Sequence, residues 1–303
     1  MIRPPMGTAP TTAHRFELLA AAVLFSTGGA AIKACGMTSW QVASFRSLIA
    51  ALALLALLPA ARRGWSLRTA AVGAAYAATM LLYVLGNKLT TAANTIFLQG
   101  TAPLYIVLLG PWLLGEKIRL RDLGFMATLA LGMGLFFVGA QAPTDIAPDP
   151  RLGNILGAAA GVTWALTIMG LRMLGRDGSV ATGSTAAVAC GNLIAGLVAL
   201  PMALPVIGTG PTDWGIVIFL GVIQIGLAYV FFTRGVRGVP ALEASLLLLV
   251  EPVLNPIWAW LVHGERPANW AILGGVVILG ATAVNTLLGA RPATGTPRGA
   301  LRR

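Results

Sequence analysis

The chain has 303 residues, of which 57% are hydrophobic and only 10% are charged. Soluble domains carry roughly 25% charged residues, so this chain has too few charges to cover a soluble fold of its length, and a surface that faces lipid is indicated. The net charge of +11 does not indicate nucleic-acid binding, because the basic residues lie between apolar segments and form no single patch with interleaved aromatic residues.

Ten apolar segments are separated by turn signals rich in Gly, Pro and charged residues. Each is long enough to cross a membrane, since about 20 apolar residues in a helix span a hydrocarbon core of about 30 Å. The sequence therefore predicts an all-α polytopic membrane protein with spans at 16–35, 39–60, 67–86, 92–114, 121–140, 152–174, 182–205, 214–233, 241–263 and 268–289. The first segment also resembles a signal peptide, but the spans that follow favour an uncleaved helix.

The spans group into two halves that a polar linker joins. Residues 141–151, with three prolines and two aspartates, separate a first five-helix repeat at 16–140 from a second at 152–289. Residues 1–15 and the Pro/Gly/Arg-rich tail 290–303 flank the two repeats. Counted by membrane side, 16 Lys and Arg residues fall on the side of the two termini and 4 on the other. Because basic residues concentrate in cytoplasmic segments, we predict a multi-pass protein of the cell (inner) membrane with both termini in the cytoplasm.

An internal repeat relates the two halves. When the chain is shifted by 149 residues, the segment 86–117 aligns without gaps with the segment 235–266, including a mid-span proline, Pro103 or Pro252, and a closing Gly-Glu-Lys/Arg turn. Each half holds an odd number of spans, so the second half must enter the membrane from the opposite side. Inverted repeats of this kind favour transport by alternating access around a central site over simple duplication of a structural bundle.

These repeated residues resemble a known family. The stretches 92–117 and 241–266 resemble the EamA-type repeat of the drug/metabolite transporter superfamily. The segment 44–51, Ser-Phe-Arg-Ser-Leu-Ile-Ala-Ala, resembles the arginine-bearing second helix of that repeat, although Gly191 replaces the arginine in the second half. The resemblance covers 16–289, and the overall pattern is most similar to the aromatic amino-acid exporter branch. It implies a ten-helix exporter of amino acids, other metabolites or drugs, with a central cavity lined mainly by helices 1, 3, 4, 6, 8 and 9.

Three polar side chains lie at mid-depth in predicted spans, where a polar group is costly. Glu251 lies within about 2 Å of the midplane of the ninth span, at a rise of 1.5 Å per residue. We interpret it as a contact for a substrate ammonium or a proton-binding site, with a protonated acid bonded to a neighbouring helix as the alternative. Gln99 and Gln224 are candidates to bind a substrate carboxylate or backbone, with interhelical hydrogen bonds as the alternative.

Aromatic side chains also fall within spans and not only at the membrane interfaces, where a belt of such residues is expected. They are Tyr76, Tyr83, Trp164 and Tyr229. We interpret them as an amphipathic wall for an aromatic or aliphatic side chain, with ordinary packing as the alternative. Stripes of small residues in the first and sixth spans indicate close helix packing. Ser26 and Thr27 on the first stripe are secondary candidates to line the cavity.

Pro103 and Pro252 are predicted to kink the fourth and ninth spans, because a proline leaves the carbonyl four residues earlier without its donor. The kink recurs in both halves, which favours a pore-lining role over a tolerated packing feature. Arg46 lies about 10 Å inside the outer end of the second span, by helix rise. We interpret it as a structural residue that pairs with a carbonyl or snorkels, with binding of a substrate carboxylate as the alternative.

Two charged turns close the repeated segments on opposite membrane faces. The first contains Glu116 and Lys117, and the second contains Glu265 and Arg266. We interpret them as solvated turns. The alternative is a pair of symmetric gate latches that form ion pairs when one face closes.

The sequence therefore predicts a secondary transporter that exports small metabolites, most of all amino acids including aromatic ones, by alternating access. A multidrug exporter of lipophilic cations is the alternative, with Glu251 as the membrane carboxylate that it needs. No nucleophile–base pair and no Cys or His spacing indicates an enzyme, a metal site or a cofactor, and no extramembrane domain indicates a scaffold. The predicted partners are a small-molecule substrate and the lipid bilayer, and not nucleic acid. The identity of the substrate, the driving force and the oligomeric state are left open.

Overall fold

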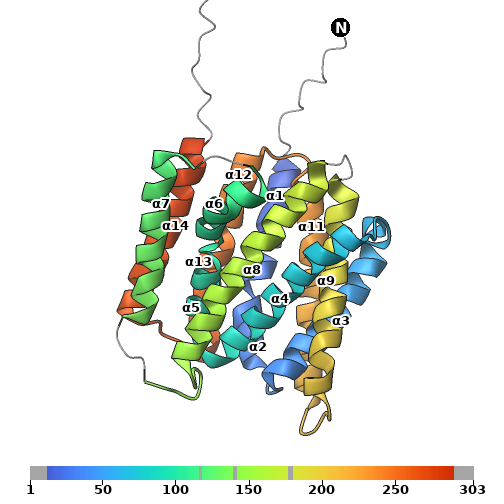
Figure 1. The fold of residues 1–303 in the computed structure, drawn as a ribbon. Helices are drawn as coiled ribbons and strands as arrows, with labels where there is room; N and C mark the ends of the chain where they lie inside the picture. Colours follow the sequence, from blue (N-terminus) through green and yellow to red (C-terminus); the bar gives the residue numbers. More distant parts are fainter. Residues whose placement is uncertain (1–11, 116–117, 139–141, 177–179, 290–303) are drawn as a thin grey trace, which may run out of the picture.

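The computed structural model describes residues 12–115, 118–138, 142–176 and 180–289. In this part of the chain, ten helical segments are long and apolar enough to cross a membrane, which confirms the predicted spans to within a few residues. The helices of the first half are α1 Thr12–Ser26, α2 Gly28–Ala34, α3 Ser39–Leu57, α4 Leu67–Leu89, α5 Ala92–Gln99, α6 Ala102–Leu113 and α7 Leu120–Gly134 (Figure 1). Those of the second half are α8 Pro150–Arg176, α9 Val180–Ala203, α10 Pro211–Ile218, α11 Ala228–Gly235, α12 Ala241–Leu248, α13 Val250–His263 and α14 Asn269–Gly289.

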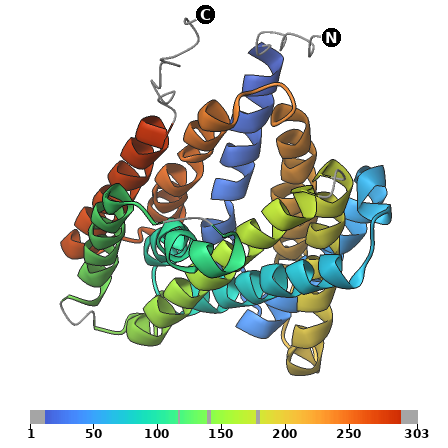
Figure 2. The same ribbon diagram turned by 45° about the horizontal axis from the view of Figure 1, so that its top comes forward.

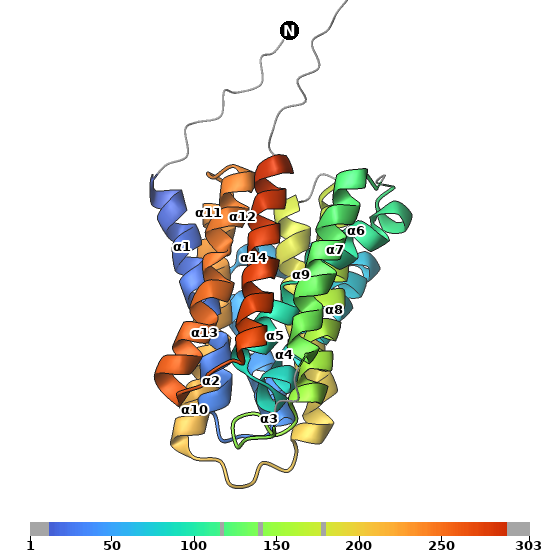
Figure 3. The same ribbon diagram turned by 90° about the vertical axis from the view of Figure 1, so that its left-hand side faces the viewer.

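The second half runs through the bundle in the reverse direction. Helix α1 begins and helix α14 ends on one face of the molecule, here named the terminal face, whereas the connection from α7 to α8 lies on the opposite face (Figures 1 and 3). The halves pack through matching pairs of helices: α4 on α8 corresponds to α11 on α1, α3 packs on α9, and α7 packs on α14. This arrangement confirms the predicted pair of inverted five-helix repeats.

Three spans are interrupted near their middle. The first changes from α1 to α2 at Thr27, the fourth from α5 to α6, and the ninth from α12 to α13. At the predicted kinks of Pro103 and Pro252, the helix is interrupted over only one or two residues. Each proline falls in the first turn of the second helix, where its missing N–H would have had no intrahelical acceptor. The eighth span contains a π-helical segment, Phe219–Leu227, which the sequence analysis did not predict, as it did not predict the break at Thr27.

Glycines on α8 allow this helix to lie close to the end of α4 and to α5, as the stripe of small residues predicts. A Cβ atom added to Gly153 would lie 2.6 Å from the backbone nitrogen of Thr90. A Cβ atom added to Gly161 would lie 2.9 Å from the carbonyl oxygen of Leu98. Neither distance leaves room for a side chain, so the approach of the two backbones depends on glycine.

The crossing of α4 and α9 depends on Gly191 in the same way, because its added Cβ would lie 2.6 Å from the carbonyl oxygen of Gly73 and 2.7 Å from Cδ1 of Tyr76. We expect Gly191→Ala to lower the free energy of unfolding by about 1–3 kcal/mol through overpacking. The measurement is the thermal unfolding midpoint of the purified protein in detergent. Gly280→Ala on α14 is the matched control, because no atom lies within 4 Å of its added Cβ. Equal midpoints for the two variants would contradict this close crossing.

Candidate functional site

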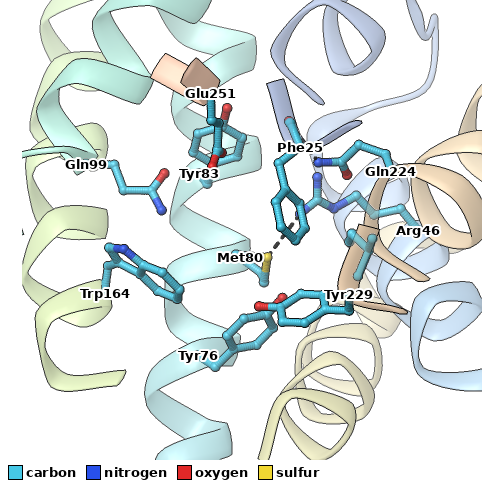
Figure 4. A pocket seen from close by; sticks show the side chains of 11 residues that line it. Phe25, Arg46, Tyr76, Met80, Tyr83, Gln99, Trp164, Gln224, Tyr229 and Glu251 are labelled. Carbon is cyan, nitrogen blue, oxygen red and sulfur yellow. Dashed lines mark hydrogen bonds between the residues drawn. The ribbon is translucent and has the colours of Figure 1, made fainter. Parts of the chain in front are cut away.

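A cavity of about 100 Å³ lies between the two halves where the interrupted spans meet (Figure 4). The residues that line it are Phe25, Arg46, Tyr76, Met80, Tyr83, Gln99, Trp164, Gln224, Ile225, Tyr229 and Glu251. The irregular segments supply five of them, including Ile225 of the π-helical segment. Phe25 precedes the break in the first span, Gln99 ends α5, Glu251 lies in the first turn of α13, and Gln224 lies in the π-helical segment. Breaks in these spans thus bring polar side chains to one point between the halves.

Seven of the nine residues that the sequence analysis assigned to the cavity line it: Tyr76, Tyr83, Gln99, Trp164, Gln224, Tyr229 and Glu251. Ser26 and Thr27 are not among the lining residues. The Ser26 hydroxyl is fully buried, donates to the carbonyl oxygen of Val23 at 2.6 Å and accepts from Nε1 of Trp258 at 2.9 Å. The Thr27 hydroxyl donates to the carbonyl oxygen of Leu24 at 2.7 Å. Both hydroxyls therefore donate hydrogen bonds to backbone carbonyl groups near the break of the first span.

Gln224 also stabilises that break. Its side-chain nitrogen donates to the carbonyl oxygen of Phe25 at 3.2 Å, a group that the end of α1 leaves without a helical partner. A Cβ on Gly28 would lie 2.8 Å from that nitrogen, so glycine is needed for the amide to approach. The Gln224 side-chain oxygen is buried and has no hydrogen-bond partner. Gln224 therefore makes the interhelical hydrogen bond of the alternative interpretation. Its unbonded oxygen can still accept a hydrogen bond from a substrate.

Aromatic rings form one wall of the cavity (Figure 4). The rings of Tyr76 and Trp164 meet edge to face with centroids 6.4 Å apart, and those of Phe25 and Tyr229 with centroids 5.2 Å apart. The hydroxyls of Tyr76 and Tyr229 point toward one another. Such pairs are stabilising and hold the rings in fixed orientations, so the wall is preformed.

Glu251 is the acidic residue of the cavity. Within the described part of the chain, no basic side chain lies within ion-pair distance of its carboxylate. The neighbouring Tyr83 is fixed by Asn255, whose side-chain nitrogen donates to the Tyr83 hydroxyl at 3.1 Å. The carboxylate is therefore open to a cationic ligand from within the cavity.

Arg46 lines the cavity too, which the structural interpretation of this residue did not anticipate. It enters from the same side as Gln224, whereas Gln99 and Trp164 enter from the other side (Figure 4). Its depth in the second span was the available signal, but depth alone does not distinguish a cavity residue from one that pairs with a nearby carbonyl.

A second cavity of about 570 Å³ extends from the site toward the terminal face; we name it the terminal vestibule. It shares Phe25, Trp164, Tyr229 and Glu251 with the central cavity and reaches Arg172 near the end of α8. Figure 2 turns the terminal face forward. The terminal vestibule therefore leads from the site toward this face.

On the opposite face, Lys33 and Glu265 form a buried ion pair, which we name the latch. Lys33 Nζ lies 3.4 Å from a Glu265 oxygen, and the side chains are only 4% and 3% exposed. Lys33 Nζ also donates to the carbonyl oxygens of Thr90, at 2.8 Å, and Ile146, at 2.7 Å. The other Glu265 oxygen accepts from the backbone N–H of Ala92 at 2.6 Å. The latch thus joins the first half to the end of α13 in the second.

Glu265 is therefore a buried ion-pair partner and not the solvated turn residue of our first interpretation. Its partner, Lys33, was not predicted. Arg266 is exposed, and Glu116 and Lys117 lie outside the described residues. Among the described residues, no group of three or more His, Cys, Asp or Glu side chains is placed to hold a metal ion.

Comparisons with known proteins agree with this architecture. A profile of the EamA-like transporter family matches residues 16–138 and 151–287, once in each half. The chain is 26% identical to a protein of Ancylobacter novellus named aromatic amino acid exporter YddG, over 69% of this chain and 72% of the relative. It is 23% identical to a protein of Salmonella typhimurium named threonine/homoserine exporter RhtA, over 68% of this chain and 66% of the relative. A crystal structure with 21% identity has the same fold, with a TM-score of 0.61 over 92% of this chain and 99% of the other.

Proposed function

This chain belongs to the EamA-like transporter family, and we propose that it is a secondary transporter that exports small metabolites, most of all amino acids including aromatic ones. The observation that carries this proposal is the central cavity. It lies between inverted halves, is open on one face and latched on the other, and is lined by aromatic rings and polar groups. Such an arrangement suits alternating access, in which the halves rock around one site. The names of the two exporters with similar sequences favour amino acids as the substrate class.

In this proposal, Glu251 binds the ammonium group of the substrate and Gln99 a neighbouring polar group. The side-chain oxygen of Gln99 is buried without a hydrogen-bond partner, so an N–H donor of a ligand would satisfy it. Tyr83 and Trp164 contact the substrate side chain. With both termini in the cytoplasm, as the distribution of Lys and Arg favours, the terminal vestibule is the cytoplasmic entrance. The conformation described here is then the inward-open one, ready to load substrate for export.

Export of lipophilic cations is the second candidate. It is favoured by the Glu251 carboxylate, which has no cationic partner in the described structure, and by the terminal vestibule, whose walls are mainly apolar. The two candidates make opposite predictions for ligand binding. Purified protein in detergent is heated with phenylalanine, threonine or tetraphenylphosphonium, and the unfolding midpoint is measured. A ligand that binds the native state raises the midpoint. Stabilisation by amino acids alone supports our proposal, and stabilisation by tetraphenylphosphonium alone overturns it.

Trp164 sets the size of the side chain that the site accepts. We expect Trp164→Ala to weaken phenylalanine binding by about tenfold, because a large apolar contact is lost, and to change alanine binding by less than about twofold. The measurement is competition by each amino acid for uptake of radiolabelled phenylalanine into liposomes. Trp112→Ala is the control, since Trp112 is 77% exposed on α6, away from the cavity. Equal losses for phenylalanine and alanine would contradict the assignment of Trp164 to the substrate side chain.

A further inference from the structure

Arg46 is a buried cation without a partner that matches it. The residue is 2% exposed on α3. Its Nη2 atom donates to the Met80 sulfur at 3.2 Å, and a thioether is a weak acceptor. Its Nε and Nη1 atoms are buried and make no hydrogen bond. No carboxylate in the described part of the chain lies within ion-pair distance of the guanidinium.

A guanidinium in this state is strongly unfavourable unless a ligand completes its surroundings. Arginine stays charged in proteins and carries five N–H donors in a planar fork. Buried charges in native structures are paired, because desolvation of an unpaired charge is costly. A planar fork matches a carboxylate, whose two oxygens accept two parallel hydrogen bonds. A two-bond fork pairs Nη2 with Nε or with Nη1, so a carboxylate would bind one of the two unpartnered atoms together with Nη2, whose acceptor here is the weak Met80 sulfur. The unpartnered donors therefore indicate an anionic ligand.

The surrounding cavity limits what else the ligand carries. Arg46 enters from one side, with Gln99 across the cavity from it (Figure 4). Glu251, the acidic lining residue, and the unpartnered side-chain oxygen of Gln99 both accept hydrogen bonds. One end of the cavity thus donates to an anion and the other accepts from a cation. A molecule that carries both a carboxylate and an ammonium group satisfies both sets of side chains.

We propose that Arg46 binds the substrate carboxylate opposite the ammonium-binding Glu251, so that the site selects zwitterions. The choice of an amino acid as the zwitterion rests on the proposed function. Because Gly191 stands near the matching position of the second half, the site has a single arginine and binds the substrate in one orientation. The same positive charge would repel a lipophilic cation, so this proposal disfavours the second candidate function.

Four phenyl compounds test the contributions of the carboxylate and of the ammonium group of the ligand separately. They are phenylalanine, phenylalaninamide, hydrocinnamate and phenethylamine, and their binding to the full-length protein is measured by thermal stabilisation. For the wild type we expect phenylalanine to bind at least about tenfold more tightly than phenylalaninamide or phenethylamine, since a hydrogen-bonded charge pair is lost with the carboxylate. In Arg46→Gln we expect this preference to disappear while the affinity for phenylalaninamide stays within about twofold. Arg46→Lys keeps the charge without the fork, so it keeps a reduced preference.

Arg63→Gln, an exposed arginine outside the cavity, is the matched control and keeps the wild-type preference. A wild-type protein that binds phenylalaninamide as tightly as phenylalanine overturns the proposal, even if Arg46→Gln fails to fold. A folded Arg46→Gln variant with an intact preference also overturns it. Amino-acid flux without carboxylate selectivity would leave the proposed function standing. Hydrocinnamate binding that requires Arg46, in a protein without amino-acid flux, would support the anion site and contradict amino-acid export.

Discussion

Glu251→Gln loses at least about a hundredfold of the amino-acid flux, because breaking one partner of a buried charge pair costs about 3–5 kcal/mol. The amide has nearly the same shape as the carboxylate but no charge to attract the substrate ammonium. The measurement is the initial rate of radiolabelled phenylalanine uptake into liposomes that contain equal amounts of folded protein.

The matched control for this variant is Glu243→Gln. Glu243 pairs with Arg15 at 2.5 Å near the terminal face, with its side chain 33% exposed. An ion pair in such a position contributes little, about 0–1 kcal/mol, so we expect flux within about twofold of the wild type. Normal phenylalanine flux by Glu251→Gln would remove Glu251 from the substrate site. Loss of tetraphenylphosphonium binding with unchanged amino-acid flux would favour the cation exporter.

The second large effect concerns the latch, and we expect Lys33→Met to open the opposite face. The substitution leaves the Glu265 carboxylate buried without its cation, which destabilises the closed arrangement by about 3–5 kcal/mol. Cys35 reports on this opening, because it lies two residues from Lys33 and its thiol is buried, 1% exposed. Burial also raises the pKa of the Cys35 thiol, which keeps the reactive thiolate scarce in the closed state.

The opening is measured as the rate at which a membrane-impermeant maleimide labels Cys35, in a Cys190→Ala background. We expect labelling of Lys33→Met to be at least about tenfold faster than in the parent, as the population of the open face rises. Arg266→Met removes an exposed charge beside the latch and serves as the control, with no change in rate. Equal rates in Lys33→Met and Arg266→Met would show that the ion pair does not hold this face closed.

The spans and their inversion could be predicted because their signals lie in contiguous sequence. Hydropathy marks each span, and the gap-free match of 86–117 with 235–266 marks the repeat. The repeated prolines also predicted irregular helix geometry in the fourth and ninth spans. They did not predict the break at Thr27, where no proline stands. That break is stabilised by residues of the second half, Gln224 and Trp258, which only the folded chain brings to it.

The residues of the cavity also differ in whether the sequence alone could identify them. Glu251 and Gln99 are identifiable from depth alone, since a polar group at mid-span must face protein or water and not lipid. Arg46 could not be identified from depth alone. The evidence for its role is that the neighbouring helices offer no acceptor that matches its free N–H donors. The latch is beyond sequence reasoning for a similar reason. Lys33 and Glu265 each stand at the end of a span, and only the packing of α2 against the end of α13 makes them a buried pair.

The most direct test of amino-acid export is uptake of radiolabelled phenylalanine into liposomes that contain the purified protein, with and without a pH gradient. We expect uptake that saturates, that unlabelled amino acids compete for, and that Glu251→Gln abolishes. Uptake without a gradient would identify a facilitator, and uptake that requires the gradient would identify coupling to protons. No phenylalanine or threonine flux under either condition, from protein shown to be folded, would contradict the assignment of this cavity to amino acids.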